Sequence, residues 1–360
     1  MRKGLIVFAL LILGIVLFVL ILRNVGLIQV TDALSLLSIG ELMIVLVTFF
    51  LGLVVVGALK WQKIMKAVGF NVSSFSRIFL AKWVGYSISY LTPAVFFGGG
   101  PVRFHIIKEE SDHLDSETPV SSAKIISSII LDKLILFLVS SVYFFAGVFF
   151  ILAYLDLSWL TQIVLFSFLF LVITIFWFLL HRAKKISSEK GFFIVLIERF
   201  YLNKLSFVKK NQGKVCEIEQ EIVDFFKSSK KKIWEILLLS ALEIAFVFLS
   251  YWLVVFFIGK NLEIPKLFAI KSMIDASYIV PLPAALGAME ISQAFLFKLL
   301  GFGLATGLAF SLVLRGLSLI IIFLGLLILV WLQFKYLIKK IINFFSRFAL
   351  EINKDEKNSN

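Results

Sequence analysis

Residues 78 to 108 read IFLAKWVGYSISYLTPAVFFGGGPVRFHIIK, two apolar helical stretches on either side of a break from Thr92 to Pro101. Proline removes a backbone donor and disfavours helix at the preceding residue, and glycine permits positive φ, so a helix ends at such a run. Residues 267 to 300, LFAIKSMIDASYIVPLPAALGAMEISQAFLFKLL, have the same plan with a break from Pro281 to Gly287. The breaks contain Pro93, Pro101, Pro281 and Pro283. Each segment is therefore predicted to form two half-helices.

The composition around these segments is that of a membrane protein. Of 360 residues, 60% are hydrophobic and 16% are charged, against about 45 to 50% and about 25% in soluble domains. Mean hydropathy is +1.00. This composition excludes a soluble enzyme, and a disordered chain is excluded because 40 phenylalanines cannot stay solvated. The single cysteine, Cys216, excludes a disulfide scaffold.

The charge balance is strongly basic, with 36 Lys and Arg against 23 Asp and Glu and a net charge of +13. In a membrane protein such an excess is typical of cytoplasmic loops beside the bilayer. No pattern of alternating basic and aromatic residues accompanies it, so nucleic-acid binding is not expected.

Six segments are long and apolar enough to cross a hydrocarbon core about 30 Å thick, which needs about 20 helical residues. The predicted spans are residues 4 to 22, 42 to 59, 134 to 155, 160 to 180, 236 to 258 and 304 to 334. The first has no small-residue cleavage site, so a retained helix is expected rather than a signal peptide.

Loop charges predict how the two interrupted segments lie. Residues 60 to 77, 181 to 232 and 335 onward hold four, 13 and six Lys or Arg, which places them and both termini in the cytoplasm of a multi-pass cell-membrane protein. The chain must cross the membrane an even number of times between two cytoplasmic segments, and the spans 134 to 155 and 160 to 180 already supply two crossings. The segment 78 to 108 is therefore predicted to be a re-entrant hairpin that enters from the cytoplasm and returns to it. The same count predicts that 267 to 300 is a re-entrant hairpin that enters from the exterior. The alternative is that one break is a proline-kinked full span.

The predicted fold is thus an all-α polytopic membrane protein with six transmembrane helices and two re-entrant hairpins in corresponding positions, the pattern of an inverted repeat. The expected divisions are an N-terminal membrane half, a basic amphipathic cytoplasmic linker, a C-terminal membrane half and a basic cytoplasmic tail. They cover residues 1 to 180, 181 to 232, 233 to 334 and 335 to 360.

Eight charged residues fall within apolar helices or half-helices: Lys82, Asp132, Lys133, Glu243, Lys271, Asp275, Glu290 and Arg315. Each would cost about 2.5 to 3.5 kcal/mol facing lipid at mid-bilayer, so they are expected to pair or to line a wet cavity. Plainer roles stay open for several. Asp132 and Lys133 could lie at the headgroup level, Lys271 and Asp275 could neutralise each other, Lys82 could snorkel, and Glu290 could cap a helix.

The first break has the features of an anion pocket. Gly98, Gly99, Gly100 and Pro101 start a half-helix, and Arg103 lies in its first turn. Unpaired amides together with a cation favour an anion. Close helix packing is the plainer role for the glycines.

The motifs TPA (92 to 94), GGGPVR (98 to 103), DK (132 to 133), PLPAALGAME (281 to 290) and Arg315 occur in the order typical of one family. The chain resembles the lysylphosphatidylglycerol synthase transmembrane-region family, also called flippase-like domain proteins. The resemblance implies an integral membrane domain that moves aminoacylated or glycosylated lipids between leaflets. The family usually has Glu where this chain has Gly100. No room for the soluble aminoacyl-transferase domain of the fused members is seen, so lipid aminoacylation by this chain is not expected.

The leading functional hypothesis is a transporter or scramblase of lipids with charged or glycosylated headgroups. Arg103, Arg315 and the N-termini of the half-helices would hold a phosphate, and Asp132, Asp275 and Glu290 would balance charge or bind a cationic headgroup. Two alternatives are a membrane-embedded glycosyl or phosphoalcohol transferase acting on lipid-linked substrates, and a non-catalytic partner of a soluble enzyme. No nucleotide-binding motif, metal-ligand spacing or cofactor motif is found, so a non-enzymatic role is favoured. Expected partners are a membrane phospholipid or glycolipid and, as open alternatives, a second copy of the chain or a soluble enzyme.

Overall fold

The computed structural model describes residues 27–70, 74–92, 99–113, 121–154, 212–227, 230–280 and 282–358, with single residues at 159, 162, 163, 167 and 174. Every element in these ranges is a helix, as predicted from the sequence. The expected span at 4 to 22 and most of the residues at 160 to 180 lie outside the described residues, as do Pro93, Gly98 and Pro281.

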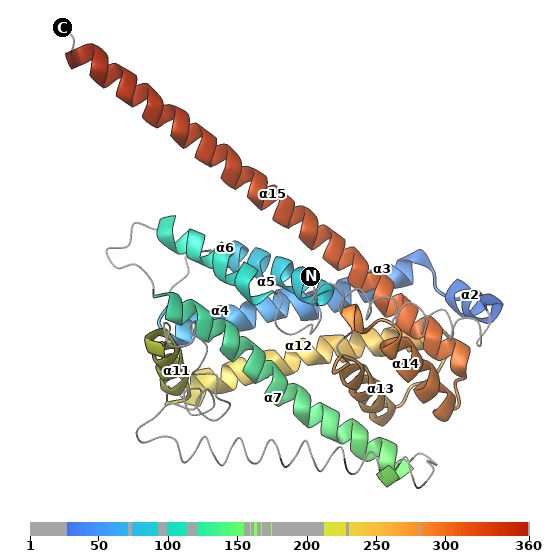
Figure 1. Ribbon diagram of the computed structural model, residues 1–360. Helices are drawn as coiled ribbons and strands as arrows, with labels where there is room; N and C mark the ends of the chain where they lie inside the picture. Colours follow the sequence, from blue (N-terminus) through green and yellow to red (C-terminus); the bar gives the residue numbers. More distant parts are fainter. Residues whose placement is uncertain are drawn as a thin grey trace, which may run out of the picture.

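Four long helices form the frame of the bundle (Figure 1). The first is continuous through α3 (Ile39–Phe50), a π-helical turn η1 (Leu51–Val56) and α4 (Gly57–Ala67). The others are α7 (Ser122–Tyr154), α12 (Lys230–Phe257) and α15 (Leu304–Asn358). The ranges Ile39–Ala67, Ser122–Tyr154, Lys230–Phe257 and Leu304–Leu332 are long and apolar enough to cross a membrane. The first is longer than the predicted 42 to 59, because the helix continues to Ala67.

The segment 78 to 108 forms a helix hairpin. Helix α5 (Phe75–Leu91) ends before the predicted break, and α6 (Gly100–His113) begins near its end. The Arg77 Nε atom lies 2.8 Å from Glu110 Oε2, which brings the start of α5 next to the end of α6. The chain therefore returns to the end of the bundle from which it came.

The segment 267 to 300 forms a second hairpin from α13 (Ile264–Ser277) and α14 (Ala288–Leu299), with a short 3-10 turn η3 (Pro283–Ala285) between them. The break begins at Tyr278, slightly earlier than the sequence predicts. Ala284 and Ala285 have φ values of 53° and 50°, an uncommon region for residues other than glycine. Lys266 Nζ lies 5.8 Å from the centre of the Phe302 ring, so the start of α13 is close to the end of α14.

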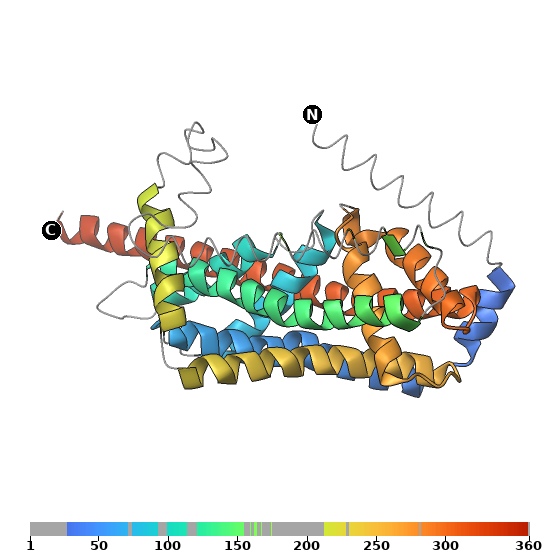
Figure 2. The same cartoon turned by 90° about the horizontal axis from the view of Figure 1, so that it is seen from below.

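The two hairpins enter the bundle from opposite ends. Lys63 near the end of α4 forms an ion pair with Glu235 near the start of α12, and Gly52 packs on Phe246 farther along, so α3–α4 and α12 are antiparallel. Short connections follow each of them, and α5 and α13 therefore start at opposite ends. Figures 1 and 2 show α5 and α6 in one half of the bundle and α13 and α14 in the other.

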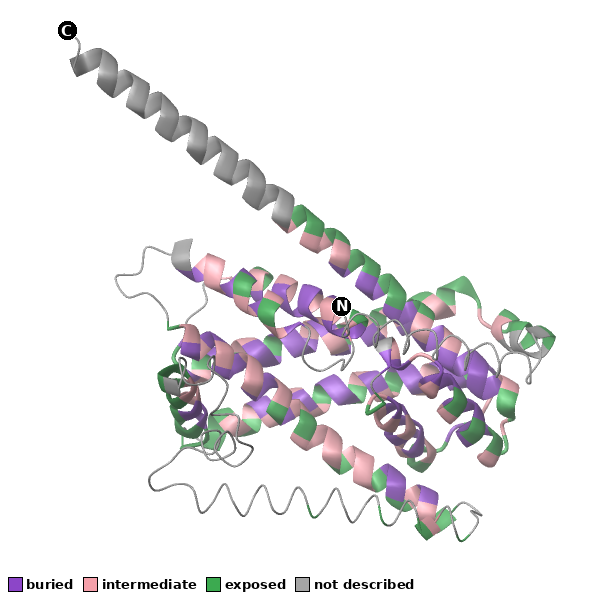
Figure 3. Cartoon of the chain, viewed as in Figure 1, coloured by how far each residue is buried: buried purple, intermediate pink, exposed green. Residues whose placement is uncertain are grey.

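Two buried apolar clusters hold the helices together, one around Phe297 and Phe310 and one around Trp61 and Ile107. Large apolar side chains such as Phe149 and Leu238 point outward and are exposed. In Figure 3 the buried residues face the inside of the bundle and the exposed ones its outside. An apolar outer surface is expected for a protein that contacts lipid.

Two shorter helices lie at the ends of the bundle. Helix α2 (Leu27–Ser35) precedes α3 and contacts α15. Helix α11 (Gln212–Lys227) packs on α7, with Ile222 and Phe225 buried. Val223 and Phe226 on the same helix are exposed.

Candidate functional site

Five buried charged residues meet in the half of the bundle that contains the first hairpin. Asp132 of α7 is their centre. Its Oδ1 atom lies 3.0 Å from Lys60 Nζ of α4, and its Oδ2 atom lies 3.0 Å from Lys82 Nζ of α5 and 2.9 Å from Arg103 Nη1 of α6. Glu243 of α12 lies 2.6 Å from Lys60 Nζ and 3.9 Å from Lys82 Nζ. We call these five residues the Asp132 cluster.

The Asp132 cluster has more positive than negative charge. Lys60, Lys82 and Arg103 face the two carboxylates of Asp132 and Glu243. Lys133, half-buried on the same helix as Asp132, adds a further positive charge beside them. The group therefore has an uncompensated positive charge inside an apolar bundle, which favours binding of an anion.

Burial makes this charge costly. Lys60 and Asp132 are 0% exposed and Arg103 is 3% exposed. Removing such groups from water costs several kcal/mol per ion, and attraction between them repays this only with good geometry. A fully buried, unbalanced cluster is weak evidence for stability and stronger evidence for function.

Arg103 has unused hydrogen-bonding capacity on two of its nitrogen atoms. Its Nη1 atom faces Asp132, and its guanidinium carbon lies 3.8 Å above the centre of the Trp61 ring. The Trp61 indole N–H donates to Ser128 Oγ at 3.1 Å, which fixes the ring. Within the part of the chain that the structure describes, the Nε and Nη2 atoms of Arg103 are buried without a hydrogen-bond partner. Since a guanidinium binds phosphate or carboxylate through two parallel N–H groups, these donors suit an anionic ligand.

Close packing between α5 and α6 positions Arg103. A Cβ atom on Gly99 would overlap the Gly85 carbonyl, and one on Gly85 would lie 2.5 Å from Arg103 Cγ. The Gly99 amide donates to Ser89 Oγ at 2.9 Å, so it is already used within the hairpin. Gly100 begins α6 and is half-buried. Gly99 of the first break therefore allows the close approach of α5 and α6.

A second group surrounds Arg315 of α15, where the two hairpins meet. Its Nε atom donates to Glu290 Oε1 of α14, and its Nη1 atom lies 3.4 Å from the Tyr90 hydroxyl of α5 and 3.2 Å from the Ala284 carbonyl oxygen. Arg315 thus contacts the end of the first hairpin and the break of the second. We call Arg315, Glu290, Tyr90 and Ala284 the Arg315 cluster.

Glu290 has two roles in the Arg315 cluster. Its Oε2 atom accepts from the Gly287 amide at 2.8 Å, which caps the start of α14 as the plainer prediction supposed. Its other oxygen binds Arg315. Gly287 has φ 81°, a conformation that glycine adopts without strain.

A small cavity lies beside Arg315. It has a volume of about 10 Å³, which is enough for about one water molecule. Aromatic and polar side chains surround it: Phe49, Tyr90, Tyr251, Tyr278 and Ser318. The Nη2 atom of Arg315 is buried without a partner, so a bound water or a ligand oxygen would satisfy it.

Lys271 and Asp275 form a separate pair. The Lys271 ammonium donates to both Asp275 oxygens one turn along α13, which agrees with the plainer prediction that they neutralise each other.

Pro101 lies in the first turn of α6, and Pro283 begins η3. Within the described residues, no group of three or more His, Cys, Asp or Glu side chains is placed to hold a metal ion.

Three residues of the Asp132 cluster and its surroundings were not among the predicted site residues. Lys60 was assigned to a loop, Glu243 was recognised only as an intramembrane charge, and Trp61 was not singled out. The assignment of Lys60 to a loop is wrong for a physical reason. A sequence-based prediction ends an apolar span at its first charged residue, whereas this helix continues seven residues beyond Lys60. The apolar positions Trp61, Ile64 and Met65, at helical spacing after Lys60, were the available signal.

Together, membrane-length helices, outward apolar side chains and buried charge define an integral, polytopic α-helical membrane protein. Comparison with protein families matches residues 6–348 to the family described as "Lysylphosphatidylglycerol synthase TM region". The chain belongs to this family, as its motifs indicate. Comparison with curated proteins found no match to the chain.

Proposed function

We propose that this protein moves lipids with charged or glycosylated headgroups between the two leaflets of the cell membrane. The observation that carries the proposal is the Asp132 cluster, a buried group with excess positive charge and two unpartnered N–H donors on Arg103. A phosphate is the anion common to lipid headgroups, and it matches the planar donor pair of arginine.

The proposed membrane topology gives each hairpin a different side. The hairpin α5–α6 opens to the cytoplasm and α13–α14 to the exterior, so that the two halves of the protein form an inverted repeat. The order long helix, hairpin, long helix occurs twice, and α3–α4 is antiparallel to α12. Transporters with inverted repeats bind substrate near mid-membrane where broken helices meet, and the contacts of Arg315 with both hairpins support a role for it at such a site.

The two clusters are joined by α5. Lys82 in the Asp132 cluster and Tyr90 in the Arg315 cluster are eight residues apart on this helix, a rise of about 12 Å. A headgroup phosphate that pairs with Arg103 would compete with Asp132 for it. If the phosphate then moved toward Arg315, it would reach a guanidinium that contacts both hairpins. There it would compete with Glu290 for Arg315 and so weaken the contact between the two hairpins. Substrate binding and opening would be coupled in this way.

The test is flipping of a fluorescent phospholipid in proteoliposomes that contain the full-length protein. Arg103→Ala and Arg315→Ala are expected to reduce the flipping rate at least tenfold. Arg77→Ala is the matched control, since it removes an arginine that pairs with Glu110 at the base of the same hairpin, outside both clusters. Unchanged flipping in both site variants, with the protein still folded, would reject the proposal.

A further inference from the structure

A basic cavity lies at the end of the bundle where α4 ends and α12 begins, outside both clusters. Its volume is about 360 Å³, within the range of small-molecule pockets of about 300 to 1,000 Å³. Its lining includes Lys63 and Lys66 of α4 and Lys231, Lys232, Glu235 and Ile236 of α12. The cavity is thus formed by two helices that are both candidate membrane spans.

The charges in this cavity are unbalanced. Four lysines face one carboxylate, and that carboxylate, Glu235, forms an ion pair with Lys63 at 2.9 Å. Glu235 also attracts Lys231, but it is the only acidic side chain among the described residues that line the cavity, so the lysines there exceed the carboxylate by three charges. Three neighbouring ammonium groups repel each other, so an anion between them would stabilise the arrangement.

The start of α12 strengthens the attraction for an anion. Lys231 and Lys232 lie in its first turn, where the helix dipole is positive and the first amides have no partner within the helix. Basic residues are unfavourable at this end of a helix. A ligand with several oxygen atoms would offset both the dipole and the lysine charges.

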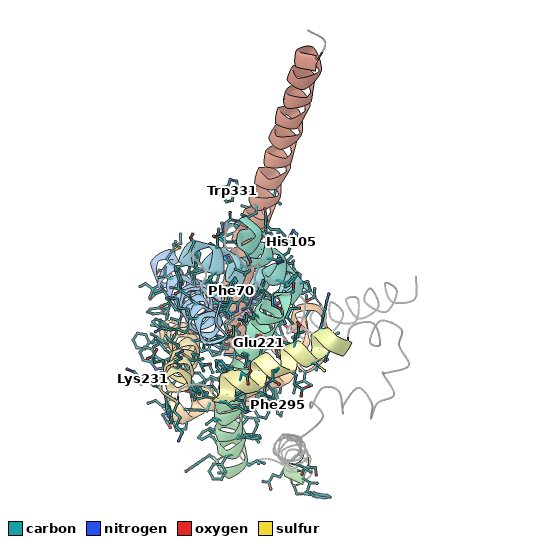
Figure 4. The ribbon with its side chains drawn as sticks, turned by 90° about the vertical axis from the view of Figure 1, so that its left-hand side faces the viewer. Phe70, His105, Glu221, Lys231, Phe295 and Trp331 are labelled. Carbon is teal, nitrogen blue, oxygen red and sulfur yellow. The ribbon has the colours of Figure 1, made fainter. Side chains whose placement is uncertain are left out.

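The position of the cavity suits a lipid headgroup. Trp234, between the lysines and Ile236 on α12, is 64% exposed, and tryptophan and lysine at the ends of spans are typical of the headgroup level. Figure 4 shows Lys231 at the rim of the bundle, seen from this end. Ile236 is buried, and Glu243 lies seven residues farther along α12, a rise of about 10 Å. The cavity is therefore separate from the Asp132 cluster.

We propose that this cavity is a second lipid site, which binds the phosphate-bearing headgroup of an anionic phospholipid in the leaflet at this end of the bundle. Lys66, Lys231 and Lys232 contact the headgroup oxygens, and the lipid tails lie along the apolar outer surface of the spans. Basic pockets between membrane helices are known binding sites for anionic headgroups in general. The site requires no transport activity.

The experiment is native mass spectrometry of the full-length protein in detergent, titrated with phosphatidylglycerol or with zwitterionic phosphatidylcholine. The test variant carries Lys66→Gln, Lys231→Gln and Lys232→Gln and keeps the pair Lys63–Glu235. A matched control removes three lysine charges at the opposite end of the bundle, through Lys260→Gln, Lys266→Gln and Lys298→Gln. Thermal unfolding of each variant checks that it is folded.

The tightest phosphatidylglycerol adduct is expected to weaken about a hundredfold in the test variant, since each lysine near an anionic headgroup contributes about a fivefold factor. The control variant should bind phosphatidylglycerol about as tightly as the unmodified protein does. Phosphatidylcholine should bind weakly to the unmodified protein, the test variant and the control variant. Phosphatidylglycerol binding by the test variant as tight as that by the unmodified protein would overturn the proposal. Displacement of that lipid by inorganic phosphate at similar concentration would also overturn it, because the ligand would then be a free anion.

Discussion

In the Asp132 cluster one carboxylate contacts cations from three helices. In the Arg315 cluster one guanidinium contacts oxygen atoms of Tyr90 in the first hairpin and of Glu290 and Ala284 in the second. The Asp132 cluster has more cations than carboxylates, and two nitrogen atoms of Arg103 have no hydrogen-bond partner among the described residues. The Arg315 cluster pairs one cation with one carboxylate and leaves a single donor beside a small cavity. The comparison suggests that the Asp132 cluster binds the ligand and that the Arg315 cluster joins the hairpins.

The largest expected effect comes from removing the central charge of the Asp132 cluster. Asp132→Asn leaves Lys60, Lys82 and Arg103 with Glu243 as the only carboxylate of the cluster. Breaking a buried ion pair by removal of one partner costs about 3 to 5 kcal/mol. Thermal unfolding in detergent should show this loss, and the double variant Asp132→Asn with Lys82→Met should recover part of it. An unfolding temperature equal to that of the unmodified protein would contradict the buried network.

The next effect concerns the packing that positions Arg103. Gly99→Ala would place a methyl group against the Gly85 carbonyl, and overpacking of this kind costs about 1 to 3 kcal/mol. Gly316→Ala is the control, because its added Cβ would have no described atom within 4 Å apart from the neighbouring residues and backbone of its own helix. Unfolding measurements should show destabilisation for Gly99→Ala and no loss for Gly316→Ala. Equal behaviour of both variants would refute the close approach of α5 and α6.

A smaller effect is expected at the junction of the hairpins. Tyr90→Phe removes a hydroxyl group that lies 3.4 Å from Arg315 Nη1 and also forms a hydrogen bond with the Ser318 side chain. Loss of a hydrogen bond to a charged group costs about 1.5 to 3 kcal/mol at most, and this long bond should cost less. Stability should therefore change by about 1 kcal/mol, while flipping changes more, because the junction is weakened. A larger change in stability than in flipping would assign Tyr90 a purely structural role.

The smallest effect is expected for the exposed pair at the end of the bundle. The Lys63 and Glu235 side chains are 53% and 40% exposed, and such pairs contribute about 0 to 1 kcal/mol. A double-mutant cycle with Lys63→Ala and Glu235→Ala should give a coupling energy in this range that decreases with added salt. A coupling above about 2 kcal/mol would indicate that this end is more buried than the structure shows.

The breaks at Thr92 to Pro101 and Pro281 to Gly287 could be predicted because proline and glycine act locally. The predicted helix boundaries around them agree with the structure within a few residues. The sequence also predicts that intramembrane charges should pair, since isolated charges are too costly in lipid. It could not indicate which residues pair, because Asp132 and Lys82 are 50 residues apart and meet only when the helices pack.

Lys60 shows a further limit of sequence-based prediction. The rules that end an apolar span at a charge and assign basic residues to cytoplasmic loops treat each lysine alike. They do not register that Lys60 lies on the buried face of a helix, where Glu243 approaches from a distant segment. The role of Arg315 at the junction was equally hidden, because it depends on tertiary contacts of Arg315 with Tyr90 of the first hairpin and with Glu290 and Ala284 of the second.

Cysteine accessibility tests most directly the claim that the two hairpins open to opposite sides of the membrane. In a Cys216→Ser background, Ser76→Cys lies at the start of α5 and Lys298→Cys near the end of α14, and both positions are exposed. A membrane-impermeant maleimide added to intact cells should label the Lys298→Cys variant, and it should label the Ser76→Cys variant only after permeabilisation. Labelling of both positions from the same side would contradict the account.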